Sequence, residues 1–222
     1  HRDLHSFPTR RSSDLVQEPY FRIGRGQYHE SMRLQLLGGG NIVTTGQTAT
    51  VTSSDTSVLA VLTPELPFAT NGSSPFVRLL GKGVGSANIT ITVPGITPDV
   101  RAWTVTTPDL FLSTFGGGGN INADSASYSI SVSMRDGVNV SRPAADTVFA
   151  MLRSTNPAVM LVTDSIARFL PGSSSNITAR VRAIGPGTAL LVLSAPNFRS
   201  DTSGLITVQP RRLEISGTAT QV

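Results

Sequence analysis

Two stretches of the chain follow the same pattern. Residues 53–61 read SSDTSVLAV and residues 153–162 read RSTNPAVMLV. Each has a Ser or Thr, then an Asp or Asn, then one or two turn residues and a short apolar run. A second pair follows in the same order, GKGVGSANITITVPG at 81–95 and RAIGPGTALLVLSAP at 182–196. Motifs repeated in a fixed order indicate two copies of one structural unit.

Prolines mark the edges of the repeat. Pro19, Pro108 and Pro210 each end a strand-like run, and another run begins directly after each of them. The second unit is the longer one, mainly through a glycine-rich insertion, Gly116 to Ser127. We predict the end of a preceding repeat at 16–19, complete units at 20–108 and 109–210, and the start of a truncated third repeat at 211–222.

The opening residues, 1–15, do not fit this pattern. They read HRDLHSFPTRRSSDL and resemble the translation of a short-read sequencing adapter over all fifteen positions. We therefore predict that they are an artefact and leave them out of the fold prediction. The natural start of the chain is then expected to be missing, so a signal peptide would not be visible.

Alternating apolar and polar residues predict β-strands. Residues 128–134 alternate apolar side chains with serine, and residues 86–93 alternate them with Ser, Asn and Thr. Such strands place one face on a core and the other in water, as in antiparallel sheets packed face to face. The best helical candidate, residues 27–37, has period two in its second half. We therefore predict an all-β chain of tandem β-sandwiches, each with about seven strands. Strands are expected near 20–24, 31–37, 47–53, 58–63, 76–81, 86–93 and 100–107, and near 109–114, 127–134, 146–153, 158–163, 176–184, 187–195 and 204–209.

The two pairs of motifs resemble bacterial immunoglobulin-like repeats of the group 2-like kind, as in intimin/invasin-type surface proteins. The matching elements are the Ser-Ser/Thr-Asp/Asn turn into one strand and the Gly-x-Gly-Ser/Thr-Ala turn into another. Antibody-type hallmarks are missing, because the chain has no cysteine pair and Trp103 falls in the last strand of its unit. The resemblance implies tandem immunoglobulin-like β-sandwiches, a cell-surface or extracellular setting, and a stalk or adhesive role.

The residue types needed for catalysis are scarce. The absence of cysteine excludes a disulfide, a thiolate zinc site and a cysteine nucleophile. Beyond residues 1–15 the one histidine is His29, which we predict to lie on the surface. Acidic residues such as Asp136 and Asp201 stand alone, and we predict them to be solvated turn residues. We therefore predict no catalytic, cofactor-binding or metal-binding residue, no cofactor, and a chain that is not an enzyme.

Other binding sites have weak signals. GKGVG at 81–85 is predicted to be a hairpin turn and not a phosphate loop, because a β-run follows it. Trp103 is predicted to be a core residue, and the insertion at 116–127 is the best place for a ligand. The formal charge of +4 falls to +3 without residues 1–15 and is not clustered, so we expect no nucleic acid. No apolar run approaches the roughly 18 residues that cross a membrane.

The leading hypothesis is a non-enzymatic immunoglobulin-like repeat segment of a bacterial cell-surface or secreted protein, acting as a stalk, spacer or adhesion module. The alternative is a carbohydrate- or protein-binding accessory module of a secreted hydrolase. The expected partners are neighbouring immunoglobulin-like repeats in the same chain, and then a glycan or a host or cell-surface protein.

Overall fold

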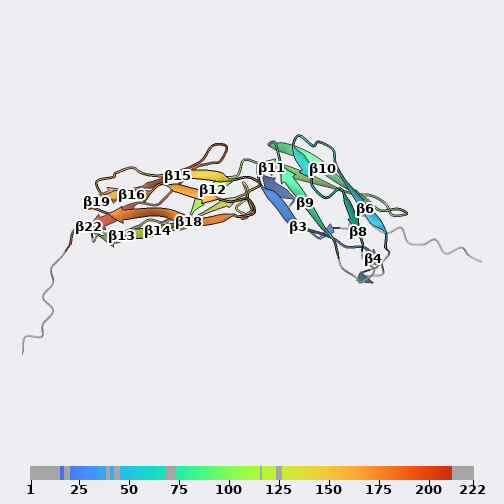
Figure 1. The fold of residues 1–222 in the computed structure, drawn as a ribbon, viewed down its shortest axis with the longest axis horizontal. Coiled ribbons are helices and arrows are strands. Elements are labelled where there is room, and N and C mark those ends of the chain that lie inside the picture. The colour runs from blue at the N-terminus through green and yellow to red at the C-terminus, as the bar shows by residue number, and fades with distance from the viewer. Residues whose placement is uncertain are drawn as a thin grey trace, which may run out of the picture. The chain divides into compact units, whose positions relative to one another are not determined.

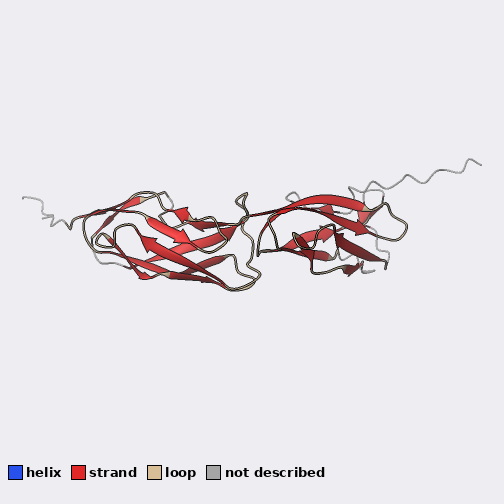
Figure 2. Ribbon diagram, turned by 90° about the horizontal axis from the view of Figure 1, so that it is seen from above, coloured by secondary structure: helices blue, strands red, loops and turns tan. Residues whose placement is uncertain are grey.

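The described part of the chain is built from strands and loops. The computed structural model describes residues 16–17, 21–38, 41–42, 46–68, 74–115, 117–123 and 127–211. Within these ranges every regular element is a β-strand and none is a helix (Figure 2). The all-β prediction is confirmed, and the weak helical candidate at 27–37 contains a strand. The predictions for residues 1–15 and 212–222 lie outside the described residues.

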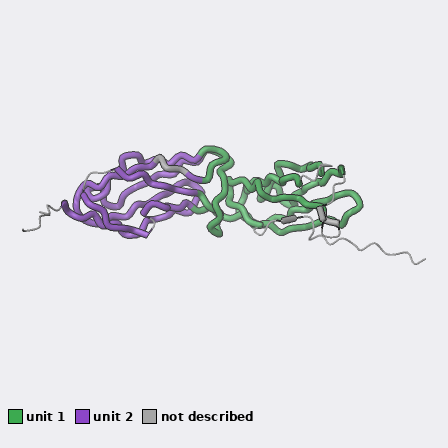
Figure 3. The backbone as a smooth tube through the Cα atoms, turned by 90° about the horizontal axis from the view of Figure 1, so that it is seen from below, with its two compact units in different colours: residues 1–109, 134–147, 170–174 green, residues 110–133, 148–169, 175–222 purple. Residues whose placement is uncertain are grey.

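The chain divides into two compact units (Figure 3). Unit 1 consists of residues 1–109, 134–147 and 170–174. Unit 2 consists of residues 110–133, 148–169 and 175–222. Two short segments that lie late in the sequence therefore pack with the residues of unit 1. The repeat boundaries at 20–108 and 109–210 stay predictions.

Unit 1 has two sheets and the buried core between them. Its core holds the single tryptophan, Trp103, together with Ile23, Met32 and Ile89, all fully buried. A short hairpin pairs β4 (Leu37–Gly38) with β5 (Asn41–Ile42). The first sheet has the order β1 (Val16–Gln17), β3 (Tyr28–Leu34), β9 (Phe76–Gly81), β7 (Leu59–Val61), and the second β2 (Arg22–Gly24), β11 (Asp99–Thr106), β10 (Gly85–Thr92), β6 (Thr48–Ser53), β8 (Glu65–Pro67).

Unit 2 repeats this order strand by strand, with one interruption (Figure 1). The layer that corresponds to the five-stranded sheet of unit 1 is divided into two smaller sheets. The first sheet has the order β12 (Asp109–Leu112), β14 (Ser127–Arg135), β18 (Ser175–Ala183), β16 (Met160–Asp164). The divided layer has β13 (Gly119–Asn122), β22 (Ile206–Gln209), β19 (Gly187–Ala189) and then β17 (Ile166–Phe169), β15 (Val148–Ser154), β20 (Leu191–Ser194), β21 (Asp201–Thr202).

Both units have the strand order of an immunoglobulin-like sandwich, with an additional edge strand, β8 or β17. The first strand of each unit is split between the two sheets. Its second half pairs in parallel with the last strand, β2 with β11 and β13 with β22. The second half of the first strand and the last strand of each unit are therefore hydrogen-bonded side by side.

The first repeated motif forms the same turn in both units. The carbonyl oxygen of Asp55 accepts the N–H of Leu59 at 2.9 Å, and that of Asn156 accepts the N–H of Met160 at 2.9 Å. The residue before each turn residue hydrogen-bonds to a segment far along the chain, β10 in unit 1 and the link between β19 and β20 in unit 2. Ser54 Oγ accepts the N–H of Asn88, and Thr155 Oγ1 accepts the N–H of Leu190 at 2.9 Å.

The glycines of the second repeated motif pack against the turn of the first. Gly85 and Gly187 have positive φ angles of 157° and 141°, which side chains rarely adopt. A Cβ on Gly85 would lie 3.2 Å from Val58, and one on Gly187 would lie 2.7 Å from Val159. The two valines belong to the turns of the first motif, so the two motifs recur together because their residues are in contact.

Most of the predicted strands have counterparts within a few residues, and the differences have local causes. The prediction missed β8 and β17, because Glu65–Pro67 contains proline and Ile166–Phe169 follows β16 with little turn signal. The predicted strand at 187–195 is interrupted at Leu190. The glycine-rich insertion, for which no strand was predicted, contains β13.

Candidate functional site

His29, the one candidate for a general base, lies in the core of unit 1. It is 1% exposed, and its ring packs edge-on against Trp103 with 4.9 Å between the ring centroids. Burial, and secondly the positive charge of Arg142, lower the pKa of His29 to about 3. The surface prediction is therefore wrong. Alternation counted back from Met32 and Leu34 places His29 on the outer face, and the register shift between His29 and Met32 is what brings it inward, so the local pattern could not reveal its burial.

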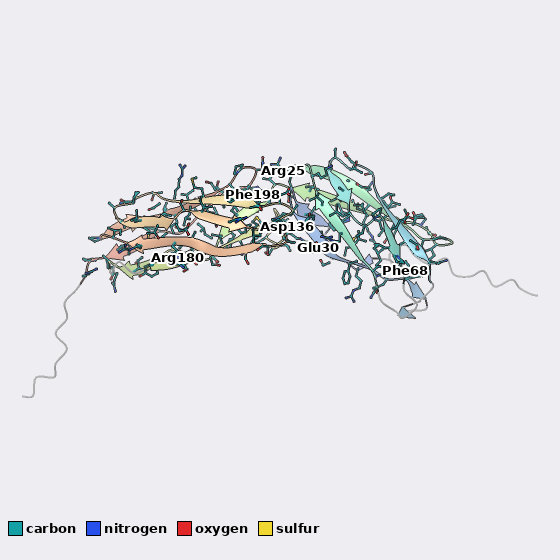
Figure 4. All side chains as sticks on the ribbon, in the orientation of Figure 1. Arg25, Glu30, Phe68, Asp136, Arg180 and Phe198 are labelled. Carbon is teal, nitrogen blue, oxygen red and sulfur yellow. The ribbon has the colours of Figure 1, made fainter. Side chains whose placement is uncertain are left out.

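Asp136 is also buried, which corrects its prediction as a solvated turn acid (Figure 4). It has no solvent exposure, and its carboxylate faces Arg142 with 3.4 Å between Nε and Oδ2. Oδ1 of Asp136 accepts the N–H groups of Val138 at 3.1 Å and Val140 at 2.9 Å. The acid therefore closes its own turn and compensates the charge of a buried arginine.

Backbone hydrogen bonds fix this turn within unit 1. The N–H of Tyr28 donates to the carbonyl of Pro143 at 2.9 Å, and the N–H of Ala145 donates to that of Gly26 at 2.8 Å. Arg142 Nη2 donates to the carbonyl of Arg22 at 3.4 Å. Because the carboxylate of Asp136 already accepts three donors away from solvent, this polar cluster can position a loop but is not arranged to bind substrate.

The remaining acidic residues form no metal centre in the part of the chain that the structure describes. Asp201 is half-buried, and its Oδ2 accepts the N–H of Leu112 at 2.7 Å within unit 2. Asp55 lies in its turn, where hydrogen bonds from Ser57, first from its hydroxyl and then from its backbone, lower the pKa of the carboxyl group. These acids stabilise loops.

The glycine run at 81–85 joins β9 to β10, so a β-strand follows it, as predicted. The two strands lie in different sheets and do not pair, so the run is a connection between sheets and the hairpin prediction is wrong. Trp103 is fully buried, as predicted. The proposed ligand loop at 116–127 forms β13, which pairs with β22, and beside it Phe115 packs edge-on against Tyr128 at 5.8 Å between ring centroids. In the described residues there is also no helix long and apolar enough to cross a membrane.

The sequence analysis missed an exposed apolar surface on unit 2. Phe149 and Met151 on β15 and Ile166 on β17 are 57%, 41% and 47% exposed. They lie together, because Met151 pairs with Ile166 and Phe149 pairs with Arg168 across the two strands. The signal was in the sequence, since VFAML at 148–152 is apolar at every position where a one-sided strand would alternate.

Comparisons with known proteins find similarity in solved structures alone. No family model and no curated protein matches the chain. A C-terminal 282-residue fragment of intimin, solved in complex with the intimin-binding domain of the translocated intimin receptor, is 14% identical with a TM-score of 0.39. The match covers 87% of this chain and 64% of the intimin fragment, so this chain spans less than two thirds of that length.

Two further matches are of similar strength. Domains 5–6 of the S-layer protein SbsC are 16% identical, with 87% of this chain and 95% of that chain covered and a TM-score of 0.37. The adhesin InvE of Yersinia pseudotuberculosis is 15% identical, with 88% of this chain and 60% of that chain covered and a TM-score of 0.32. The fold assignment rests on the strand order of the chain itself.

Proposed function

We propose that the chain is a non-enzymatic immunoglobulin-like repeat segment of a bacterial cell-surface or secreted protein, with the role of a load-bearing spacer. One observation carries this proposal. In both units the second half of the split first strand, β2 or β13, pairs in parallel with the last strand, β11 or β22. The motif resemblance and the adhesins and S-layer proteins among the structural matches support the setting outside the cell.

The parallel pairing matters because of the direction in which force acts. Tension applied through the chain ends loads β12 and its pairing with β14 first. Once β12 has separated, the tension pulls the start of β13 and the end of β22 in opposite directions along the strand axes. The hydrogen bonds between Gly119–Asn122 and Ile206–Gln209 must then break together, and they cannot open one by one. The same holds for β2 and β11 in unit 1. A spacer between a cell surface and a binding domain must resist such tension.

The experiment compares two directions of pulling on the same protein. Residues 16–222 are stretched through their ends in a single-molecule instrument, with flanking marker domains that identify single chains. In the second arm, unit 2 is pulled through cysteines introduced by Asn122→Cys and Gln209→Cys. These two exposed residues are register partners at the same end of β13 and β22, and the natural chain has no cysteine.

The spacer role predicts that unit 2 unfolds at a clearly higher force through the chain ends than through the cysteine pair. The cysteine pair opens the hydrogen bonds one at a time, whereas the ends load them in shear. Equal unfolding forces in the two directions would overturn the proposal. Chemical unfolding of the double-cysteine variant is the control that its stability matches that of the natural chain.

A further inference from the structure

The exposed apolar surface of unit 2 has a matched position in unit 1. In unit 1, β6 presents Thr48, Thr50 and Thr52 outward, while Ala49 and Val51 face the core. In unit 2, β15 presents Phe149, Met151 and Arg153 outward, while Ala150 and Leu152 face the core. The two strands therefore hold equivalent places in their sheets and carry opposite kinds of outward side chain.

The strand pairings make this correspondence exact at single residues. Thr50 pairs with Glu65 on one side and Thr92 on the other. Met151 pairs with Ile166 and Ser194 in the same two positions. The next outward residues, Thr52 and Arg153, pair with Thr90 and Val192. We call the outward residues Phe149, Met151, Arg153, Ile166, Arg168 and Val192 the β15 face.

The matched positions of unit 1 carry Thr48, Thr50, Thr52, Thr90 and Glu65, so the sheet does not require large apolar residues there. On the β15 face three large apolar side chains stay about half exposed. Removing the exposed part of a Phe, Met or Ile side chain from water is favourable, so a bound partner would gain free energy at this face. Contiguous apolar groups of this kind mark interaction sites on soluble proteins.

The charges on the β15 face limit the partner. Arg168 holds its guanidinium carbon 5.8 Å from the centre of the Phe149 ring. Arg153 donates from Nε to the sulfur of Met151 at 3.2 Å. Both charged residues of the face are arginines, so a second copy of the same face would bring like charges together, which opposes binding. Carboxylates on a partner would instead complement them.

The side chains favour a protein partner over a glycan. Phe, Met and Arg are residue types enriched at protein interfaces. The four uncharged residues of the face are apolar and offer no side-chain hydrogen bond to a sugar hydroxyl, and the hydroxyl of Ser194, the register partner of Met151, lies at its border. We infer that the β15 face docks a partner protein through an apolar segment flanked by Asp or Glu residues. This inference goes beyond the spacer role and does not rest on it.

The test selects partners by their chemistry. A random-peptide library on phage is selected against the immobilised full chain and, in parallel, against the variant Phe149→Thr, Met151→Thr, Ile166→Glu. This variant gives unit 2 the residues that unit 1 has at Thr48, Thr50 and Glu65. Exposed strand positions accept threonine well, and thermal unfolding checks that the variant is folded.

We expect peptides rich in Asp or Glu and in apolar residues, which bind the variant at least about tenfold more weakly than the natural chain. The control variant Thr48→Ser, Thr50→Ser on the matched face of unit 1 should bind them unchanged. Recovery of no peptide that distinguishes the natural chain from the variant would overturn the inference, and so would recovery of mainly basic peptides.

The nuclear magnetic resonance signals of the methionine methyl groups locate the site at which a peptide binds. The chain has four methionines, of which Met32, Met134 and Met160 are fully buried and Met151 is exposed. A selected peptide should shift the methyl signal of Met151 and leave the other three in place. If Met151 stays unshifted, the docking surface is wrongly placed. Broadening that grows with protein concentration alone, or a shift with an acidic oligosaccharide but no peptide, would contradict a protein partner.

Discussion

The hairpin formed by the last two strands is continuous in unit 1, and the corresponding hairpin of unit 2 is interrupted. In unit 1, β10 and β11 pair without interruption from Gly85 with Val105 to Ile91 with Asp99. In unit 2 the corresponding segments form two shorter pairings, β19 with β22 and β20 with β21. The break lies at Ser203–Leu205, where Ser203 Oγ accepts the N–H of Leu191 at 2.9 Å.

The glycine-rich insertion occupies this break. The carbonyl of Phe115 accepts the N–H of Gly118 at 2.9 Å and that of Gly204 at 3.2 Å, and Gly119 donates to Leu205. Gly118 has a φ of 81°, and the backbones of Gly117, Gly118 and Gly204 lie too close for a Cβ on Gly204. The comparison teaches that the repeated turns define the strand order, whereas an insertion decides whether a sheet is continuous.

The largest expected effect concerns unit 1, which is stabilised by a loop from the later part of the sequence. Asp136→Ala should lower the free energy of unfolding of unit 1 by about 3–5 kcal/mol, because it leaves Arg142 buried without its counter-charge. Fluorescence of Trp103, the single tryptophan, reports unit 1 in a urea titration.

The double variant Asp136→Ala, Arg142→Met is the control. Removing both charges should recover a large part of the lost stability, since replacement of a buried ion pair by apolar residues is often neutral. A single variant within about 1 kcal/mol of the natural chain, the usual range for surface positions, would contradict the buried cluster.

Acid should lower the free energy of unfolding of unit 1 more than that of unit 2, since His29 lies in unit 1 and residues 110–222 contain no histidine. The pKa of His29 is lowered to about 3 in the folded state, so between pH 6.5 and 3 only the unfolded state takes up the proton. The stabilisation is complete above pH 6.5 and decreases as the pH falls. At pH 4.5, unit 1 should have lost about 2–3 kcal/mol relative to pH 7.

Urea titrations of Trp103 fluorescence at the two pH values measure this loss. The variant His29→Phe keeps an aromatic ring beside Trp103 and should lose most of the pH dependence in this window. An equal loss in His29→Phe and in the natural chain would show that another group is responsible.

The stability of the divided layer of unit 2 should depend on Gly204. Gly204→Ala should destabilise unit 2 by about 1–3 kcal/mol, because its Cβ meets backbone atoms of Gly117 and Gly118. The methyl signal of Met160, buried in unit 2, follows unfolding in urea. Gly117→Ala is the matched control, since a Cβ there meets no atom within 4 Å. Equal effects of the two substitutions would disprove the close approach.

The smallest expected effect is one that should be equal in both units. Ser54→Ala and Thr155→Ala each remove a hydroxyl that accepts a backbone N–H, and each should cost about 1 kcal/mol. Trp103 fluorescence measures the first loss and the Met160 methyl signal the second. Clearly unequal losses would mean that the repeated motif has different roles in the two units.

The sequence was sufficient to predict the strands whose residues alternate. β10 and β14 are one-sided, so their spacing alone gave their position and inner face. The paired motifs also predicted the repeat, because each turn is made by local hydrogen bonds of Asp55 or Asn156. Trp103 was correctly predicted to be buried, since it lies between Ala102 and Thr104 in a predicted strand.

Long-range contacts explain what could not be predicted. The burial of His29 and Asp136 depends on residues 134–147 packing on β2 and β3, and no local pattern carries that information. The glycine insertion looked like a loop, because its strand β13 is held by β22, far along the sequence. The β15 face was overlooked because VFAML is also typical of a strand buried on both sides, and the exposure of Phe149 and Met151 in the folded unit shows that one side of it is open.

The contact between Val58 and Gly85 has a consequence for how such repeats diverge. Gly85 follows Val58 by 27 residues, and Gly187 follows Val159 by 28, yet each pair shares one small volume. A repeat that exchanges the glycine for a larger residue must shrink the valine as well. The two positions should therefore change together among distant members of such arrays, and this correlated pair would identify a repeat whose remaining sequence has drifted beyond recognition.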